Sequence, residues 1–407
     1  MDITQDFVDE RFKTFVLDRF CENPGRIQTS DVEGIVSLQL ANLQFTSLKG
    51  LEHFSSLEEL DCSFNHLTEL DISQNEHLIR LECKKNNLHL LDTSHNLKLK
   101  ELACDNNEIY SLDLSANVQL EAVDCSFNRL RNLNVSHNPL ITKLICSWNM
   151  ISDLHVEHNP HLQKLNCSYN SLFNLELKRN ASLVHLDCGS NYLIELIIQD
   201  GAGLVEIRCN SNHLKQLDVS QCPVLESLRC FQNHLTSLDL NHNPLLNELY
   251  CSENKLTELN ISCNPMLKRL DYADNLIVEP DHTVKGMGTF RYDRSLCSYQ
   301  TALRYKDMEL SVRADVPAKA DMKRLSPVIK TTWERLDQLH EQAADLIART
   351  HPDEDVTELV LSELEFDKDA TIRIGYDAGE SPAGHLYIYA VFNRKHELSS
   401  QLVYETY

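Results

Sequence analysis

The sequence lacks several features that would place it in a familiar functional class. None of its apolar runs approaches the roughly 20 residues of a transmembrane helix, so we expect no membrane partner. Residues 1–10 carry four acidic side chains and no apolar stretch, so we expect no secretory signal. The chain has no glycine-rich phosphate loop, no H-E-x-x-H motif and no C-x-x-C motif. We therefore expect no cofactor, no metal and no catalytic residue.

Basic residues are also scarce. The 407 residues include 38 Lys and Arg against 61 Asp and Glu, which gives a formal charge of −23. Residues 282–407 hold 16 basic and 21 acidic side chains, a net −5, so residues 1–281 carry the remaining −18. A nucleic-acid partner would need a basic face, and we expect none. A protein partner of opposite charge would be attracted.

Cysteine, in contrast, is plentiful and regularly spaced. Ten of the 14 cysteines follow one another at intervals of 21 residues, and an asparagine stands three residues after each. They are Cys62, Cys83, Cys104, Cys125, Cys146, Cys167, Cys188, Cys209, Cys230 and Cys251. The next interval reaches Tyr272, again followed by an asparagine. A period of this length predicts a solenoid.

The unit L-x-x-L-x-C-S-x-N-x-L-x-x-L-D-x-S-x-N-x-x is a leucine-rich repeat. We expect its L-x-C segment to form a short strand that stacks in parallel on the next coil. In that strand Leu60 and Cys62 would point inward, and Asp61 and Ser63 outward. The second half, such as residues 70–73, predicts a second strand or an extended segment.

The asparagines and cysteines of the repeat both have structural explanations. A buried amide at each asparagine, beginning with Asn65, can bond the exposed backbone of neighbouring coils. Stacked strands would place the thiols about 4.8 Å apart with parallel side chains, which suits disulfide geometry poorly. Metal ligands must converge on one point, which a row along an axis does not do. We therefore predict a reduced, buried cysteine ladder, which favours a cytoplasmic location.

The chain is predicted to have three parts: an N-terminal helical cap in residues 1–33, a solenoid in residues 34–281 and a small domain in residues 282–407. The expected fold is an α/β leucine-rich-repeat solenoid of about twelve coils followed by a small α+β domain. Solenoid ends need caps, and residues 5–22 predict a helix for this purpose. Its apolar positions are Phe7, Phe12, Phe15, Val16, Leu17 and Phe20.

These repeats resemble the 21-residue cysteine-ladder repeats of internalin J and related bacterial leucine-rich-repeat proteins. The resemblance covers residues 34–281, and the helix followed by an irregular first coil resembles theirs as well. It implies the solenoid fold and a binding role. The sequence shows neither a secretion signal nor a cell-wall sorting motif, so the resemblance does not imply surface adhesion.

In the last 126 residues the 21-residue repeat is absent, and the pattern of apolar and polar residues predicts strands and helices. Strands are expected around residues 289–292, 308–312, 370–376, 385–392 and 399–404. One long helix or two are expected in residues 321–350, with Pro327 in the first turn, and a further helix in residues 358–364. The acidic residues 353–355 are interpreted as a solvated loop.

This domain resembles an uncharacterised bacterial family found among toxin-immunity proteins. The resemblance lies in an opening hairpin, a central helix and strands around a Gly-His pair, here Gly384-His385-Leu386-Tyr387-Ile388. By this resemblance Tyr299 corresponds to the aromatic residue of that family's hairpin. The resemblance implies a protein that binds and silences a toxin.

Outward positions of the strands and turns form the expected binding face. Three aromatic residues occupy the same position on consecutive coils, and a second group contains arginines; both types are common at binding hot spots. The candidate partner-binding residues are Phe127, Ile145, Trp148, Tyr169, Arg208, Arg229, Phe231 and Tyr250. The alternatives are scattered surface residues, or residues covered by the C-terminal domain. Histidines such as His95, His137, His158 and His242 are interpreted as turn residues.

Three functions remain open at this stage. The leading hypothesis is a non-enzymatic immunity protein that neutralises a toxin, possibly a basic one. The second is an effector whose repeats bind a host protein. The third is an enzyme that uses the repeats as a substrate receptor, with Cys297, His385 and Asp377 as a nucleophile, a base and a carboxylate. The oligomeric state is not indicated by the sequence.

Overall fold

The computed structural model divides into two compact units, Met1–Tyr272 and Ala273–Tyr407, each of which is described by itself. The structure describes residues 1–23, 25–199, 201, 203–277, 280–293, 296–316, 319–352, 359–381 and 384–406. The three-part division expected from the sequence, with boundaries after residues 33 and 281, stays a prediction.

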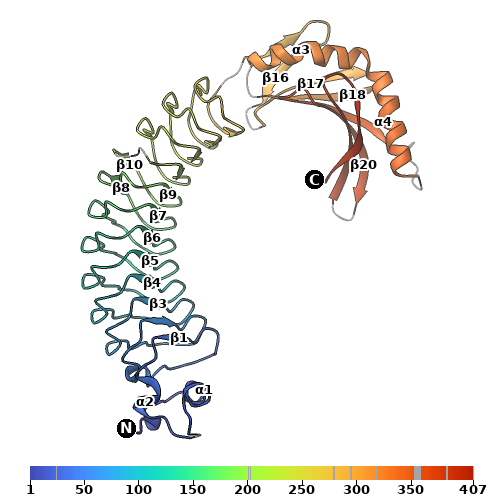
Figure 1. The fold of residues 1–407 in the computed structure, drawn as a ribbon. Helices are drawn as coiled ribbons and strands as arrows, with labels where there is room; N and C mark the ends of the chain where they lie inside the picture. Colours follow the sequence, from blue (N-terminus) through green and yellow to red (C-terminus); the bar gives the residue numbers. More distant parts are fainter. Residues whose placement is uncertain are drawn as a thin grey trace. The chain divides into compact units, whose positions relative to one another are not determined.

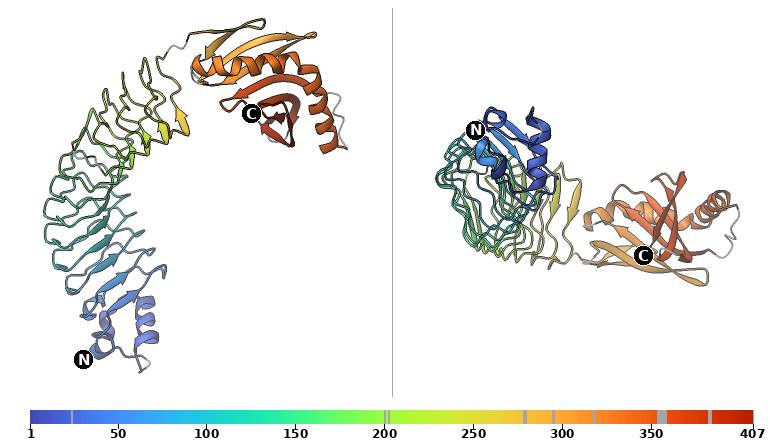
Figure 2. Two further views of the ribbon diagram at one scale, coloured as in Figure 1. Left: turned by 45° about the horizontal axis from the view of Figure 1, so that its top comes forward. Right: turned by 90° about the horizontal axis from the view of Figure 1, so that it is seen from below.

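The first unit is a solenoid whose coils each contribute one short strand to a parallel sheet of twelve strands (Figure 1). The strands are β1 (Ser37–Gln39), β2 (Glu59–Asp61), β3 (Arg80–Glu82), β4 (Glu101–Ala103), β5 (Ala122–Asp124), β6 (Lys143–Ile145), β7 (Lys164–Asn166), β9 (His185–Asp187), β11 (Glu206–Arg208), β12 (Ser227–Arg229), β13 (Glu248–Tyr250) and β14 (Arg269–Asp271). Equivalent residues pair across neighbouring coils, as Leu60 does with Leu81. Figure 2 shows the coils stacked without insertion. The predicted solenoid is confirmed.

The return half of each coil is mostly extended without regular pairing. Only β8 (Asn174–Leu177) and β10 (Glu195–Ile198) form a second, two-stranded parallel sheet among the described residues. The expectation of a strand or an extended segment is therefore met by extended backbone on most coils and by strands on two. Residues 70–73 belong to the extended class.

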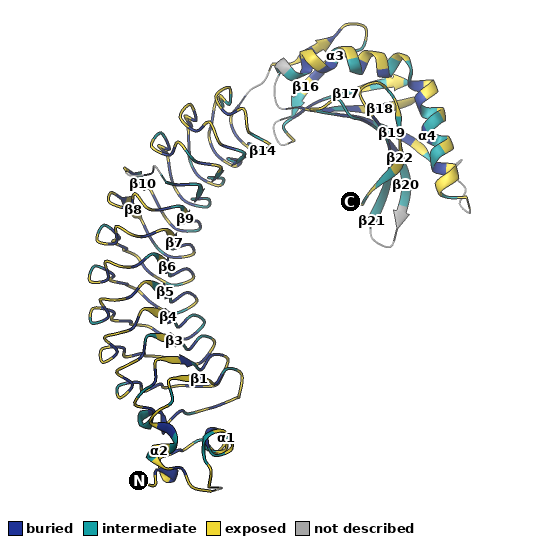
Figure 3. Ribbon diagram, in the orientation of Figure 1, coloured by how far each residue is buried: buried dark blue, intermediate teal, exposed yellow. Residues whose placement is uncertain are grey.

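The buried residues of the solenoid, dark blue in Figure 3, recur in every coil. Leucines and the ladder cysteines make up most of them. All ten ladder cysteines are unbridged and have no exposed surface. The prediction of an outward Ser63 is wrong, because β2 ends at Asp61 and the chain has begun to turn before Ser63, which is fully buried. On another coil the turned serine, Ser126, donates its hydroxyl to Asp124 Oδ1 at 2.6 Å.

Two rows of asparagine amides tie the coils together. In the predicted row, Asn191 Nδ2 donates to the carbonyls of Cys167 (3.0 Å) and Cys188 (3.1 Å), and its Oδ1 accepts from the Leu172 amide at 3.0 Å. A second row, not predicted, lies at the end of the return segment. There Asn138 Nδ2 donates to Leu114 O and to Asn117 O, both at 2.9 Å. Each amide thus satisfies backbone groups that the solenoid would otherwise bury unpaired.

The N-terminal end of the solenoid is covered by η1 (Thr4–Asp6), α1 (Glu10–Phe20), α2 (Thr29–Val32) and η2 (Leu51–His53). The Asp9 carboxylate caps α1 by accepting from the Arg11 amide at 2.8 Å, and its second oxygen accepts from the Thr46 amide at 2.7 Å. The predicted helix is confirmed, but it starts later than residue 5. Phe7 lies before α1 and packs on the Phe12 ring, with centroids 5.4 Å apart.

The second unit is an eight-stranded sheet with two helices along one face (Figure 1). In chain order its elements are β15 (His282–Val284), β16 (Gly288–Asp293), β17 (Ser298–Tyr305), β18 (Met308–Asp315), α3 (Lys319–Glu334), α4 (Leu336–Thr350), β19 (Val360–Asp367), β20 (Ile372–Ser381), β21 (Gly384–Phe392) and β22 (Leu398–Thr406). The strands adjoin in this same order, and only β18 and β19 are parallel, because the helices connect them. The expected α+β class is confirmed.

Three histidines join the helices and neighbouring segments of this unit. His282 Nε2 bonds Ser326 Oγ at 2.7 Å, His340 Nδ1 bonds Tyr376 Oη at 2.8 Å, and His396 Nε2 bonds Thr332 Oγ1 at 2.9 Å. Burial lowers the pKa of each imidazole, because the charged form loses solvation. These joints are therefore formed by neutral rings at neutral pH.

Two expectations for this unit are wrong. Residues 358–364 were expected to form a helix, but the described part of that segment belongs to β19, whose buried Leu364 and Phe366 alternate toward the helices. Pro327 is the ninth residue of α3 rather than part of its first turn. Among the described residues, none of the helices combines the length and apolar character that a bilayer span requires.

Candidate protein-binding surface

The three predicted aromatic residues leave the solenoid at a left-handed turn. Phe127, Trp148 and Tyr169 have φ angles of 52°, 56° and 53°. The turn belongs to the repeat, because every residue two positions after the ladder position shares this conformation, including Asn106 and Asp274. The turn is held between coils, since the Phe127 amide donates to Ser147 O at 2.9 Å. The backbone therefore directs one side chain per coil into solvent.

The three rings form a stack. Phe127 and Trp148 lie 5.2 Å apart between centroids with planes inclined by 10°, and Trp148 and Tyr169 lie 4.0 Å apart at 11°. The spacing follows the coil repeat of about 4.8 Å. Each residue is nonetheless 46–47% exposed. The rings thus cover one another's faces in part and leave about half of each side chain open to solvent.

Aromatic residues are an unfavourable choice for such a turn. A residue other than glycine, asparagine or aspartate costs roughly 1–2 kcal/mol in the left-handed conformation. Stacking of adjacent rings recovers about 0.5–1.5 kcal/mol per pair. Asn106 and Asp274 show that the repeat also takes better-suited residues at this position. Lys85, Gln232 and Glu253 are equally unsuited to the turn, so the turn alone does not single out the rings. Their exposure on three consecutive coils is what marks them as a candidate contact surface.

A second group of exposed apolar residues begins on the coil that carries Tyr169, and the sequence analysis missed it. Phe173 and Tyr192 pack with ring centroids 5.9 Å apart, and the row continues through His213 and His234, with spacings of 6.0 and 5.6 Å. Exposed fractions of Phe173, Tyr192 and Ile194 are 54%, 49% and 60%. These residues follow the ladder cysteines by four or six positions, and tabulating those columns would have revealed them. We call Phe127, Trp148, Tyr169, Phe173 and Tyr192 the aromatic surface.

The other predicted binding residues lie on the strands. Ile145 ends β6 and is half-buried. Arg229 on β12 lies over the Tyr250 ring of β13, 5.0 Å from its centroid, and 3.8 Å from a carboxylate oxygen of Glu248. The structure therefore brings Arg229 and Tyr250 together.

Arg208 and Phe231 lie near this pair. Arg208 pairs in register with Arg229, and its Nη2 is 2.7 Å from Glu206 Oε1. Burial alone would raise the pKa of Glu206, but the hydrogen bond and charge of Arg208 outweigh burial and lower that pKa. Phe231 is half-buried beside this group in sequence. Because the arginines already have carboxylate neighbours, the aromatic surface is the stronger candidate.

The strand face of the first coils is acidic. Strands β2–β5 and the adjoining turn carry Glu59, Asp61, Glu82, Glu101, Asp105 and Asp124. Lys84 Nζ lies 2.7 Å from Glu82 and Arg80 Nη2 lies 2.5 Å from the same carboxylate, while Arg80 Nε also lies 3.5 Å from Glu101. Burial raises the pKa of Asp105, while the Asn106 amide that donates to it at 2.8 Å opposes the shift. The remaining negative charge suits a basic partner.

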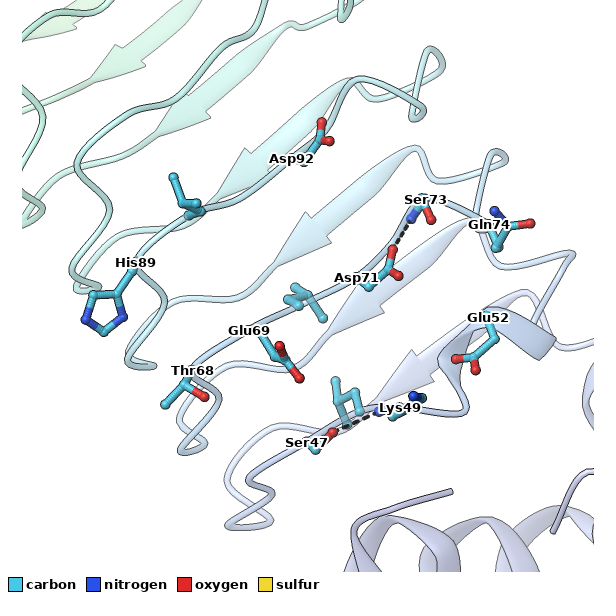
Figure 4. Close-up of a pocket in the computed structure, with 13 residues that line it drawn as sticks. Ser47, Lys49, Glu52, Thr68, Glu69, Asp71, Ser73, Gln74, His89 and Asp92 are labelled. Carbon is cyan, nitrogen blue, oxygen red and sulfur yellow. Dashed lines mark hydrogen bonds between the residues drawn. The ribbon is translucent and has the colours of Figure 1, made fainter. Parts of the chain in front are cut away.

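A hollow of about 680 Å³ lies on the return segments near the N-terminal end (Figure 4). Its labelled side chains come from consecutive coils, and Glu69, Asp71 and Asp92 among them are exposed. The Asp71 carboxylate accepts from the Ser73 amide at 3.0 Å, and this hydrogen bonding lowers its pKa. These carboxylates are therefore explained as solvent-exposed side chains of the turns. The histidines expected in return turns, His95, His137, His158 and His242, are exposed there as well.

The residues considered for enzymatic chemistry do not come together. His385 Nε2 lies 2.7 Å from Asp377 Oδ1, so that pair forms. Cys297, however, precedes β17, and three strands separate β17 from β21, which carries His385. Among the described residues, no group of three histidine, cysteine, aspartate or glutamate side chains could hold a metal ion. The acidic residues 353–355 lie outside the described part of the chain.

Comparisons with known proteins agree with this architecture. No protein-family model and no curated protein matches the chain. Among solved structures, it is similar to the functional domain of InlJ from Listeria monocytogenes, which includes a cysteine ladder. The two are 31% identical, with 69% of this chain and 72% of that chain covered and a TM-score of 0.54.

Two further solved structures share the fold. A leucine-rich-repeat protein of Leptospira interrogans is 24% identical, with 58% of this chain and 66% of that chain covered and a TM-score of 0.54. The internalin InlF from Listeria monocytogenes is 20% identical, with 68% and 79% covered and the same TM-score.

Proposed function

Since the chain belongs to the leucine-rich-repeat proteins, we propose that it is a non-enzymatic protein that binds another protein through the aromatic surface. The observation that carries this proposal is the exposed stack of Phe127, Trp148 and Tyr169 on left-handed turns that do not favour aromatic residues. A second exposed ring pair, Phe173 and Tyr192, lies on the coil of Tyr169 and the next coil. Exposed apolar patches rimmed by polar residues typically mark interaction sites.

The partner is proposed to be a basic protein. The chain carries a net charge of −23, and the acidic strand face lies on the coils next to the stack. Opposite fields accelerate association, while buried aromatic side chains slow dissociation. The finer hypothesis is an immunity protein that blocks the active site of a toxin, in the cytoplasm. It is supported by the acidic charge and by the resemblance of the second unit to a toxin-immunity family.

Affinity capture with paired variants tests the binding role. The full chain is immobilised beside its Trp148→Ala and Phe64→Ala variants, and the captured proteins are compared. Phe64 occupies the same turn position, is 45% exposed and lies under Lys85 Nζ rather than in the stack. We expect a partner that is retained by Phe64→Ala and lost by Trp148→Ala. A partner that binds both variants equally would show that the aromatic surface is not the contact.

Genetics tests the finer hypothesis. A gene for an immunity protein lies beside a toxin gene, and its deletion sensitises the cell to that toxin. Restoring the chain should rescue growth, whereas the Trp148→Ala variant should not, although the protein is equally abundant. If deletion has no effect in the presence of the neighbouring gene product, the immunity hypothesis fails while the binding role can still hold.

A further inference from the structure

The two edge strands of the sheet in the second unit differ in length. The first edge is β15, which has only three residues, His282–Val284. The last is β22, which has nine, Leu398–Thr406. Strand β21 pairs with one side of β22, and within the part of the chain that the structure describes no strand pairs with its other side. Alternate residues of an edge strand direct backbone N–H and C=O groups outward.

Strand β22 carries few of the features that usually protect an edge. Natural edge strands are shortened, carry lysine or proline, or are covered. The sequence of β22, LSSQLVYET, has no proline and no basic residue. Its single charge, Glu405, is held by Arg373 Nη1 at 3.3 Å, across the neighbouring strands. The edge is therefore long and nearly uncharged on a protein whose net charge is −23.

Apolar side chains at this edge remain partly open. Leu398 and Leu402 pack against the core of the unit but keep partial exposure, as does Val403. Tyr404 is 47% exposed, and its hydroxyl bonds His351 Nε2, beyond the end of α4, at 2.9 Å. That bond fixes the strand against the helix layer. A strand added beside β22 would extend the same apolar face.

We propose that β22 pairs with β22 of a second copy of this chain, in antiparallel orientation about a two-fold axis. Full overlap of the nine residues places Leu402 opposite the Leu402 of the second copy and Gln401 opposite Val403. In this register Glu405 lies opposite Ser399, so the only charges on the strands are kept apart. Like charges directly opposite each other would destabilise the pair. The proposal does not depend on the aromatic surface, which belongs to the other unit.

The mass of the full chain in solution tests this pairing. Light scattering after size-exclusion chromatography, over a micromolar concentration series, should give twice the mass of one chain, in a manner that follows mass action. Gln401→Lys places two like charges diagonally across the strand pair, and we expect loss of the dimer at concentrations where the unsubstituted chain is dimeric. Ser311→Lys is the matched control, because Ser311 is exposed on the interior strand β18.

Cysteine substitution tests the register. Directly opposed residues of antiparallel strands have Cα atoms about 4.5–5.5 Å apart, within disulfide range. Mild oxidation should therefore link Leu402→Cys chains covalently. Ser399→Cys chains should stay unlinked, since the two thiols would lie roughly 20 Å apart along the strands. The unsubstituted chain is the background, because Cys263 is exposed.

Three outcomes would overturn the proposal. The first is a monomer throughout the series with no link through residue 402. The second is a dimer that Gln401→Lys leaves intact, which would place the contact elsewhere. The third is a monomer whose complex with a different protein is lost in Gln401→Lys, which would mean that β22 receives a strand of that protein. None of these results depends on Trp148, so failure here and failure of the proposed function are distinguishable.

Discussion

At the scale of single residues, substitutions two positions after a ladder cysteine are expected to affect partner binding much more than folding stability. Its left-handed turn favours asparagine, yet Trp148 occupies it within the stack. We expect Trp148→Asn to change the free energy of unfolding by less than about 1 kcal/mol, since turn relief and lost stacking oppose each other. The same change should weaken partner binding by about 2 kcal/mol or more.

Urea unfolding and calorimetric titration with the captured partner measure these two quantities. Phe64→Asn serves as the control, because it makes the same change in the same turn outside the stack. A large loss of stability in Trp148→Asn alone would indicate that the rings serve the fold.

The asparagine rows should be far less tolerant. Removing the Asn191 amide leaves the carbonyls of Cys167 and Cys188 and the Leu172 amide without their partner. Each unsatisfied buried group costs about 1–3 kcal/mol. We expect Asn191→Ala to lower the free energy of unfolding by about 3 kcal/mol in urea titrations. Ser190→Ala, at the neighbouring half-buried turn position, should change it by much less; equal effects would contradict the assigned role of the amide.

The cysteines predict a pattern of chemical reactivity. Burial raises the pKa of the ladder thiols, to about 12 for Cys209 and well above the ordinary value for Cys146. Thiolates are the reactive form. We expect an alkylating reagent to modify exposed Cys263 first in the native protein, followed by the half-buried Cys297. Mass spectrometry should find the ladder modified only after unfolding; rapid native modification of Cys146 would contradict the buried core.

At the scale of elements, the histidine joints of the second unit predict a dependence on pH. His282, His340 and His396 have pKa values lowered by burial. Their contribution to stability is full above the unfolded value of about 6.5 and is lost as pH falls toward the folded values, because the unfolded chain takes up protons first.

Thermal unfolding followed by the helical circular dichroism of α3 and α4 measures this effect. We expect a lower midpoint at about pH 5.5 than at about pH 7.5, and a smaller difference in His340→Gln. His158→Gln, in an exposed solenoid turn, is the control. An unchanged midpoint across this range would contradict the assignment.

The elements also show how much the sequence could predict. The 21-residue period placed every strand from β2 to β14 that directly precedes a ladder position, because one-dimensional stacking leaves each coil a single register. It could not reveal the left-handed turn, since residues as different as Lys85, Asn106 and Trp148 occupy it. In the second unit, β19 was mistaken for a helix because a short apolar run does not distinguish the two. Phe173 and Tyr192 were missed because their contact crosses two columns of the repeat.

At the scale of the whole molecule, charge should govern how quickly a partner is captured. With a net charge of −23, encounter with a basic protein is expected to slow by at least about tenfold between low and physiological salt. Stopped-flow association rates measure this, with Trp148→Ala as the comparison. That variant should keep the salt dependence while its complex dissociates faster. A rate independent of salt would argue for an uncharged partner, and a rate that rises with salt would argue for an acidic one.

The left-handed turn has a consequence for how such a protein can diverge. Because each coil returns through the same backbone path whatever side chain the turn carries, a substitution there leaves the backbone of the neighbouring coils unchanged and alters only contacts with the side chains of the two adjacent turns. Such a protein can therefore adapt to a partner whose sequence changes by single substitutions at positions 21 residues apart. Duplication of a whole coil, together with its turn side chain, is a second route. In protein engineering, the same positions form a row of side chains that can be substituted without changing the backbone of the coils.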